Sequence, residues 1–284
     1  MKFGQFEIHT FVEQKFRLDG GTMFGVIPKS MWQKLLPADE NNLIPMFTNL
    51  FVLKAHGKTM IFDSGLGDTL TDREKKIYGT DGISSLDSGL AALGITPTQI
   101  DYIILTHLHT DHSGGAVKLH DGHYVPRFPN ATYIIEKKEW NVAINPDERT
   151  SAVYIPERLL PLHEARQVQF IEGNTELFPG VKAVFSGGHS EGHYALEMES
   201  DGARVFYYAD LYPMTPHLRT PFIPATDVHP LASLEAKRRS YPRIVNQEVI
   251  LAFDHDTIMP FARIREIDRK IIAEPVTDRT PVST

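Results

Sequence analysis

Residues 101–115 read DYIILTHLHTDHSGG, an apolar run followed at once by four side chains that can bind metal ions. The run from Asp101 to Thr106 is short and apolar, as expected of a buried strand. The four ligand-type residues come next, within six positions: His107, His109, Asp111 and His112. On an extended stretch, side chains two residues apart point the same way, so the first two histidines can converge on one ion. A turn at the last two residues would offer a second pair to a neighbouring ion.

Three more short apolar runs end in a loop that carries histidine or aspartate. They are residues 181–186 before His189, 204–208 before Asp210, and 248–253 before His255. Loops at strand ends are where α/β folds place their chemistry. Histidine and carboxylate are ligands for Zn, Mn, Fe or Co, and the chain has no cysteine that could add thiolate ligands. We therefore expect loops from both halves of the chain to build one metal centre.

The remaining sequence predicts a mixed α/β chain. Strands are expected at 49–55 and 59–63, joined by a turn at 56–58, and at 132–136, 168–171 and 195–199. Helices are expected at 30–36, 86–93, 137–144 and 231–245, with a short one from Gly115. The glycine-rich stretch 18–25 predicts a loop. We expect a single domain over residues 1–284, with an N-terminal loop and substrate-pocket segment at 1–45 and a mobile tail at 273–284.

Composition and charge limit the partners and the location that we expect for this protein. The formal charge is −7, from 29 Lys and Arg against 36 Asp and Glu, which disfavours nucleic acid and anionic membranes as partners. No stretch approaches the roughly 18 apolar residues of a membrane span, and the first residues lack the apolar core of a signal peptide. We therefore expect a cytoplasmic protein whose partner is a small molecule.

The pattern His-x-His-x-Asp-His at 107–112 resembles the signature of the metallo-β-lactamase superfamily. The segment 188–193 resembles the second ligand motif of that family, and Asp210 and His255 match its later ligands in order and type. The early turn at Asp63 resembles a family turn that orients the site without binding metal. The resemblance implies an α/β fold of four layers, the αβ/βα sandwich of the metallo-β-lactamase fold, with the metals at one edge.

The resemblance also implies a ligand set and a mechanism. The first ion would take His107, His109 and His189, the second would take Asp111, His112 and His255, and Asp210 would bridge them. His193 is expected to make a supporting hydrogen bond or to be structural. Two ions ~3.5–4 Å apart would share a hydroxide, because metal binding lowers the pKa of water toward ~7. Asp111 would carry a proton to the leaving group. Zn²⁺ is the expected metal, with Mn, Fe or Co as alternatives.

The segment 19–29, followed by Trp32, resembles the N-terminal region of quorum-quenching N-acyl-homoserine lactone lactonases. Its apolar side chains would line a pocket for an acyl chain, or else cap the core or form a homodimer contact. These side chains are Met23, Phe24, Met31 and Trp32.

The chain departs from those lactonases near the bridging carboxylate. They place a tyrosine that contacts the substrate three residues after it, where this chain has Pro213. Tyr212 is the nearest aromatic residue, so either Tyr212 takes over that catalytic contact or the substrate differs from that of those lactonases.

Three functions follow from these motifs. The first is a dinuclear metal hydrolase that opens the ring of N-acyl-homoserine lactones. The second is a phosphotriesterase or arylesterase of the same fold, similar to methyl-parathion hydrolase, since the same hydroxide can attack phosphorus or an ester carbon. The third is a non-catalytic sensor, against which the full ligand set weighs. His109 stands where flavodiiron proteins carry glutamate, which favours hydrolysis over redox chemistry.

Overall fold

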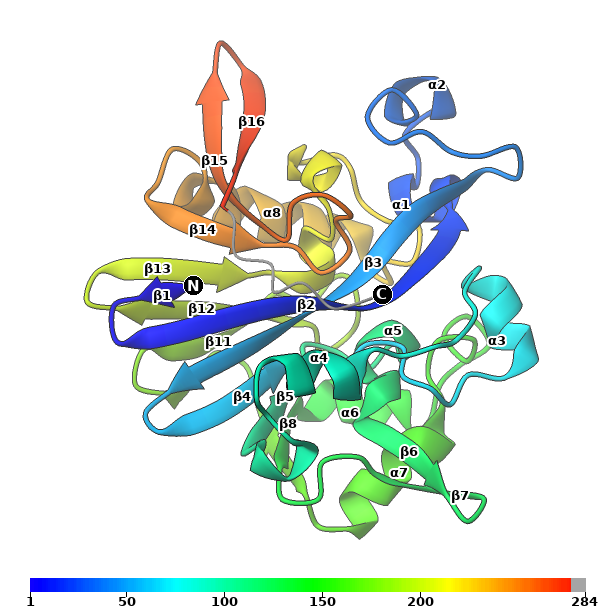
Figure 1. Cartoon of the computed structure of the whole chain (residues 1–284). Helices are drawn as coiled ribbons and strands as arrows, with labels where there is room; N and C mark the ends of the chain where they lie inside the picture. The colour runs from blue at the N-terminus through cyan, green and yellow to red at the C-terminus, as the bar shows by residue number, and fades with distance from the viewer. Residues whose placement is uncertain (277–284) are drawn as a thin grey trace.

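The computed structural model describes residues 1–276, which form two seven-stranded sheets packed face to face (Figure 1). The first sheet has, in spatial order, β1 (Lys2–Phe3), β2 (Phe6–Asp19), β3 (Leu43–Ala55), β4 (Lys58–Phe62), β5 (Tyr102–Ile104), β8 (Thr132–Glu136) and β9 (Val168–Ile171). The second has β10 (Thr175–Phe178), β11 (Val181–Phe185), β12 (Tyr194–Ser200), β13 (Ala203–Tyr207), β14 (Val249–Ala252), β15 (Phe261–Ile267) and β16 (Lys270–Pro275). A separate hairpin pairs β6 (Val117–His120) with β7 (His123–Pro126).

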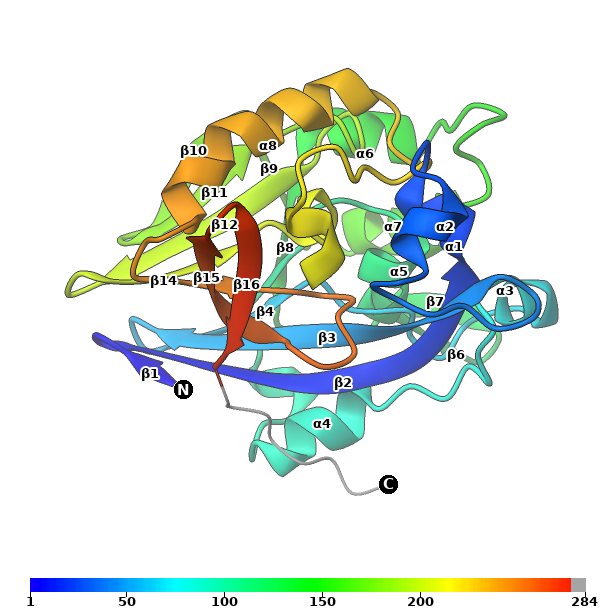
Figure 2. The same ribbon diagram turned by 90° about the horizontal axis from the view of Figure 1, so that it is seen from above.

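Helices cover the outer faces of both sheets (Figure 2). The α-helices are α1 (Gly20–Phe24), α2 (Lys29–Trp32), α3 (Asp72–Ile77), α4 (Leu86–Ala92), α5 (Thr110–Ser113), α6 (Lys137–Ala143), α7 (Pro156–Glu164) and α8 (Pro230–Ile244). Short 3₁₀ turns are η1 (Pro97–Gln99), η2 (Gly114–Ala116), η3 (Ala209–Leu211) and η4 (Thr215–Leu218). Helices α4, α6 and α7 pack on the first sheet, and α8 packs on the second. The layers therefore follow the predicted αβ/βα order.

Three apolar cores hold these layers together. Between the sheets, Phe51 and Phe62 of the first meet Tyr207 of the second. Behind the first sheet, Trp140 of α6 belongs to a second core, and Ile244 of α8 belongs to a third core behind the second sheet. Burial of apolar area contributes about 25 cal/mol per Å², so these cores are the main stabilising term.

The ligand loops leave the strands at one edge of the sandwich. Strands β5, β13 and β14 each end three residues before His107, Asp210 and His255, respectively. The two sheets are joined at this edge, because the Tyr194 amide donates to the Thr106 carbonyl at 3.1 Å and the Asn49 amide donates to the Asp254 carbonyl at 2.7 Å. Loops distant in sequence are thereby held side by side.

Most predicted elements are confirmed. The hairpin is β3 and β4, and β8 and β9 have the predicted bounds. Helices α4, α6 and α8 match their predictions within a residue or two. The short helix expected from Gly115 lies earlier in the chain, since α5 begins at Thr110 and only the 3₁₀ turn η2 contains Gly115 before strand β6 begins.

The prediction of a loop at the N-terminus is also wrong. Residues 6–19 form the long strand β2, which pairs with β3 from Glu7 to Asp19 with one irregularity between Val12 and Gln14. The glycine-rich stretch forms α1, because Asp19 accepts a hydrogen bond from the Thr22 amide as its N-cap. Gly20 is needed there, since a Cβ would lie 2.2 Å from the Trp32 ring. Of the predicted tail, residues 273–275 belong to β16, and residues 277–284 lie outside the described part of the chain.

Gly115→Ala should destabilise the protein strongly. The added Cβ would lie 2.1 Å from the Ser64 carbonyl oxygen, a backbone atom that cannot move aside alone. We expect a loss of about 3 kcal/mol in the free energy of unfolding, the upper range for overpacking. Urea unfolding measures it. The control Gly122→Ala, with open space around its Cβ, should lose only about 1 kcal/mol through its positive φ. Equal losses would contradict the packing argument.

Candidate metal centre

Four buried side chains from three loops form a first ligand group. His107 and His109 precede α5, His189 follows β11, and Asp210 lies in η3. Their ligand atoms all lie within 4.8 Å of one another. His109 Nδ1 is 3.1 Å from His107 Nε2 and 3.0 Å from His189 Nε2, and Asp210 Oδ2 is 3.0 Å from His189 Nε2.

A second group shares Asp210 with the first. It contains His112, Asp254 and His255 as well as Asp210, again within 4.8 Å. Asp210 Oδ1 lies 3.2 Å from His255 Nε2 and 3.6 Å from His112 Nε2, while those two nitrogens are 3.3 Å apart. One carboxylate therefore turns one oxygen to each group.

The residues present fit two divalent cations. In the second group, Nε2 of His112 and Nε2 of His255 face each other at 3.3 Å, and in the neutral rings both atoms carry lone pairs, which repel, because each Nδ1 already faces an acceptor oxygen. Asp210 Oδ1 is buried and has no hydrogen-bond partner among the described residues. Buried polar atoms normally have partners. Nitrogen and carboxylate oxygen are the donors that Zn²⁺ prefers in the absence of thiolate, so a cation in each group would satisfy these atoms.

Asp111 lies beside the second group. Its Oδ2 is 3.6 Å from His255 Nε2 and 4.0 Å from His112 Nε2, and its side chain is 12% exposed. Asp254 is the member of the second group that the motifs did not predict. The signal was its place next to His255 at the end of β14. Its carboxylate is buried, and burial raises its pKa to about 7.

The pKa values of the histidines in the centre are shifted in opposite directions. Burial, and the positive charge that neighbouring imidazoles can carry, hold the pKa of His107 and of His109 well below the ordinary value. Burial acts the same way on His189, but Asp210 and Asp227 outweigh it and raise its pKa to about 10. Burial opposes ionisation of Asp210 too, yet the surrounding histidines hold its pKa well below the usual range.

The second nitrogen of three ligand-type histidines is fixed by an oxygen. His112 Nδ1 lies 3.0 Å from Asp63 Oδ2, His189 Nδ1 lies 2.8 Å from Asp227 Oδ1, and His255 Nδ1 lies 2.9 Å from the Phe47 carbonyl. Such contacts set the ring orientation and leave the other nitrogen free to bind metal. Asp63 thus contacts the site as its motif predicted, whereas Asp227 carried no sequence signal.

His193 lies outside both groups. Its Nδ1 is 2.6 Å from Ser186 Oγ, and its ring centre is 5.6 Å from that of His189. Its hydrogen bond is made to a neighbouring turn residue rather than to a ligand-type side chain.

Tyr212 does not reach the metal groups, and its predicted catalytic contact is wrong. The side chain is fully buried behind the second sheet, and its hydroxyl lies 3.0 Å from Ser240 Oγ and donates to the Lys237 carbonyl of α8. The turn η3 that carries Asp210 directs the two side chains apart.

The N-terminal segment packs close to the second group. Met23, Phe24 and Trp32 are buried in one apolar cluster with Phe16, whose ring centre is 5.4 Å from that of His255. They cap this core, as one interpretation of the sequence held. Met31 is 52% exposed and does not join them.

A buried lysine holds the loop that follows Asp210. The Lys237 amine donates to the carbonyls of His217 and Phe222, and the His217 ring stacks on Phe24 at 5.0 Å. Burial lowers the pKa of Lys237 to about 7, against a smaller opposing effect of Asp227. A neutral amine still has two hydrogens, enough for both carbonyls.

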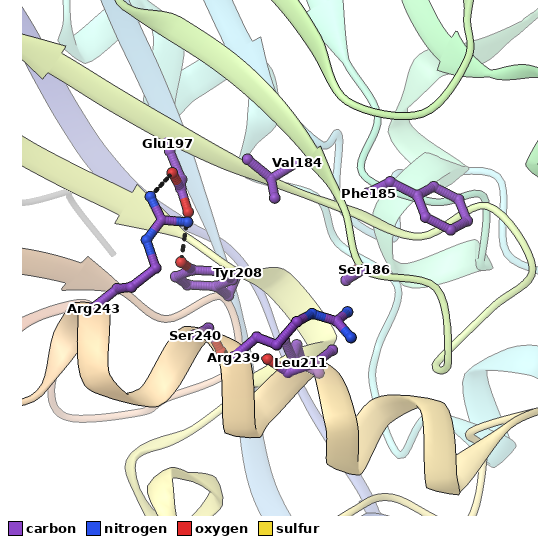
Figure 3. Close-up of a pocket in the computed structure, with 10 residues that line it drawn as sticks. Val184, Phe185, Ser186, Glu197, Tyr208, Leu211, Arg239, Ser240 and Arg243 are labelled. Carbon is purple, nitrogen blue, oxygen red and sulfur yellow. Dashed lines mark hydrogen bonds and ion pairs between the residues drawn. The ribbon is translucent and has the colours of Figure 1, made fainter.

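A cavity of about 170 Å³ lies behind the ligand loops, between the second sheet and α8 (Figure 3). Glu197 stands at one side of it, with Arg243 and the Tyr208 hydroxyl both donating to its carboxylate. Its lining contains no member of either ligand group.

Comparisons with known proteins agree with this site. Residues 43–255 match the Metallo-beta-lactamase superfamily, and the chain belongs to it. Over 221 residues it is 26% identical to an N-acyl homoserine lactonase of Bacillus thuringiensis, covering 72% of this chain and 80% of that protein. The chain is therefore a hydrolytic enzyme of a superfamily whose members typically bind divalent metals such as zinc, and the non-catalytic interpretation is set aside.

Solved structures show the same fold. A probable metal-dependent hydrolase from Staphylococcus aureus superposes with a TM-score of 0.90 at 30% identity, covering 97% of this chain and 99% of that one. AidC, a dizinc quorum-quenching lactonase, superposes with a TM-score of 0.81 over 98% of this chain and 96% of that one, at 18% identity. Within residues 1–276, no helix is both long and apolar enough to cross a membrane.

Asp63→Asn should weaken metal binding without unfolding the protein. Asparagine tolerates the positive φ of 57° at this position but cannot hold the His112 ring as a carboxylate does. We expect a loss of about 10–100-fold in Zn²⁺ affinity, measured by competition with a chromophoric chelator. Asp121→Asn is the matched control, since Asp121 has a φ of 50° in an exposed turn. Unchanged affinity in Asp63→Asn would contradict the orienting role.

Lys237→Met should remove a pH dependence of stability. The unfolded lysine titrates near its ordinary pKa of about 10.4 and the folded one near 7, so the unfolded state binds more protons between these values. The stability of the wild-type protein relative to the variant should therefore rise with pH across that window, by about 1.4 kcal/mol per unit. Urea unfolding at pH 7 and 9 tests this. Lys182→Met, at an exposed lysine, should show no such change.

Proposed function

We propose that the enzyme hydrolyses N-acyl-homoserine lactones to the open hydroxy acids with two divalent metal ions, zinc being the expected one. The observation that carries the proposal is the pair of buried His/Asp groups that share Asp210. Similarity to proteins named N-acyl homoserine lactonase supports the substrate class.

The ligand assignment follows from the two groups. His107, His109 and His189 would hold the first ion, and Asp210 would lie between the two. His112 and His255 would hold the second, with Asp111 and Asp254 as the carboxylates within reach. When bound, such ions polarise an acyl oxygen and make a nucleophile available at neutral pH.

Asp111 would move the proton. It is the most exposed of the carboxylates around the two groups, at 12%, and its Oδ2 faces His255. In ring opening, an oxygen from water bonds to the acyl carbon while the bond from that carbon to the ring oxygen breaks. A carboxylate at this position can accept the proton of the attacking water and return it to the departing ring oxygen. Asp63 and Asp227 keep the histidine rings turned toward the reacting centre.

An apolar N-terminal cluster packs beside the second group. Phe16 contacts His255, and Met23 and Phe24 lie behind it in the same cluster. These side chains are at most 3% exposed, so they pack behind the His255 ring and offer little surface to a substrate.

One observation favours the phosphotriesterase or arylesterase alternative. Tyr212 is buried against α8, and Pro213 follows it, so this turn presents no tyrosine hydroxyl to a lactone. The groups that would bind metal do not by themselves distinguish a carbonyl from a phosphoryl centre. The two substrate classes must therefore be compared by kcat/KM.

The zinc-loaded enzyme should open N-hexanoyl- and N-decanoyl-homoserine lactone in a pH-stat assay. Paraoxon and an aryl ester run beside them, and the metal-free protein gives the background. Asp111→Asn should lower kcat by about 10²–10⁴-fold, the usual contribution of a positioned acid or base. Its zinc content must be measured alongside, to separate proton transfer from metal loss. Lactone turnover no faster than background would exclude the lactonase, and higher kcat/KM for paraoxon would favour the alternative.

A further inference from the structure

We infer that Glu139 is a positioning residue that holds the loops of the first ligand group together across the two halves of the chain. The inference rests on the proposed metal centre but not on the identity of the substrate. Glu139 lies in α6 and is 1% exposed. No motif in the sequence marks it.

Each oxygen of the Glu139 carboxylate accepts two hydrogen bonds. Oε1 accepts from the Leu108 amide at 2.9 Å and from the Tyr154 hydroxyl at 2.8 Å. Oε2 accepts from the Ser190 hydroxyl at 2.6 Å and from the Gly192 amide at 3.0 Å. Four donors satisfy the lone pairs of a carboxylate, which allows a charged group to be buried there.

The donors belong to the loops that carry the ligand-type histidines. Leu108 lies between His107 and His109, and Ser190 directly follows His189. One oxygen therefore holds the loop after β5 in the first sheet, and the other holds the loop between β11 and β12 in the second. A shift of Glu139 would move the histidines of the two loops relative to each other.

Two further contacts tighten this arrangement. The Tyr154 ring, whose hydroxyl donates to Glu139, packs against the His109 ring at 4.9 Å between centres. Gly192 lies so close that a Cβ there would be 2.5 Å from the Glu139 backbone nitrogen. The loop after His189 thus rests directly on α6.

The hydrogen bonds of Glu139 differ from those of its neighbour Glu136, which is 2% exposed. Glu136 is the N-cap of α6 and accepts from the backbone amides of Lys138 and Glu139 within that helix. The hydrogen bonds of the Glu139 side chain all leave the helix. Glu136 therefore caps its own helix, whereas Glu139 holds the loops of the metal centre.

Glu139→Gln tests the inference with Co²⁺ as the probe. The amide keeps the shape but replaces one acceptor oxygen by a donor, which cannot bond to the Gly192 or Leu108 amide. We expect the affinity for one of two Co²⁺ ions to fall by about 10–100-fold, as for other residues that orient metal ligands. The visible Co²⁺ spectrum should change, while the second ion binds as in the wild type. Ser190→Ala, which removes one of the four bonds, should shift the same ion by less.

Glu136→Gln is the matched control, with equal burial in the same helix. It should lower the melting temperature without changing Co²⁺ affinity or spectrum. Wild-type Co²⁺ binding by Glu139→Gln, or the same change in both glutamine variants, would overturn the inference about Glu139. Neither outcome would affect the proposed function. A wild-type protein that takes up no Co²⁺ would overturn the proposed function as well. Loss of lactone turnover plays no part in the test, so a different substrate would leave the inference intact.

Discussion

Asp210 is the carboxylate on which the architecture depends, because both ligand groups are built around it. One of its oxygens faces His189 and the other faces His255 and His112. Burying this many ionisable groups is costly unless charges and hydrogen bonds compensate one another. The fold must therefore bring the ends of β5, β11, β13 and β14 to one edge and hold them there closely.

That edge is held by polar contacts between the sheets as well as by apolar cores. Backbone bonds from Tyr194 and Asn49 join the loops of one sheet to the other. Asp63 and Asp227 fix the rings of His112 and His189, and Glu139 connects the loop of His107 and His109 to the loop of His189. Buried and fully bonded carboxylates give orientation that apolar packing cannot, since each accepts along defined directions.

The N-terminal segment has two roles in this arrangement. As strand β2, it extends the first sheet, and its Phe16 side chain reaches the His255 ring. As α1, it lies over the loop after Asp210, where the Lys237 amine holds the His217 carbonyl and the His217 ring stacks on Phe24. The segment that packs beside the site is therefore anchored to α8 by a buried amine rather than by apolar contact alone.

The sequence by itself determined the local chemistry: the cluster at 107–112, the later histidines and aspartate, and the short strands that precede them. These are properties of neighbouring residues, and periodicity and ligand type reveal them. Only the tertiary structure decided that Asp254 joins the second group, that Tyr212 turns toward α8, that residues 6–19 form a strand and that Glu139 connects two loops. Each of these depends on partners far away in the chain, because a strand needs its neighbour's hydrogen bonds and a buried side chain takes its direction from the donors that packing brings to it.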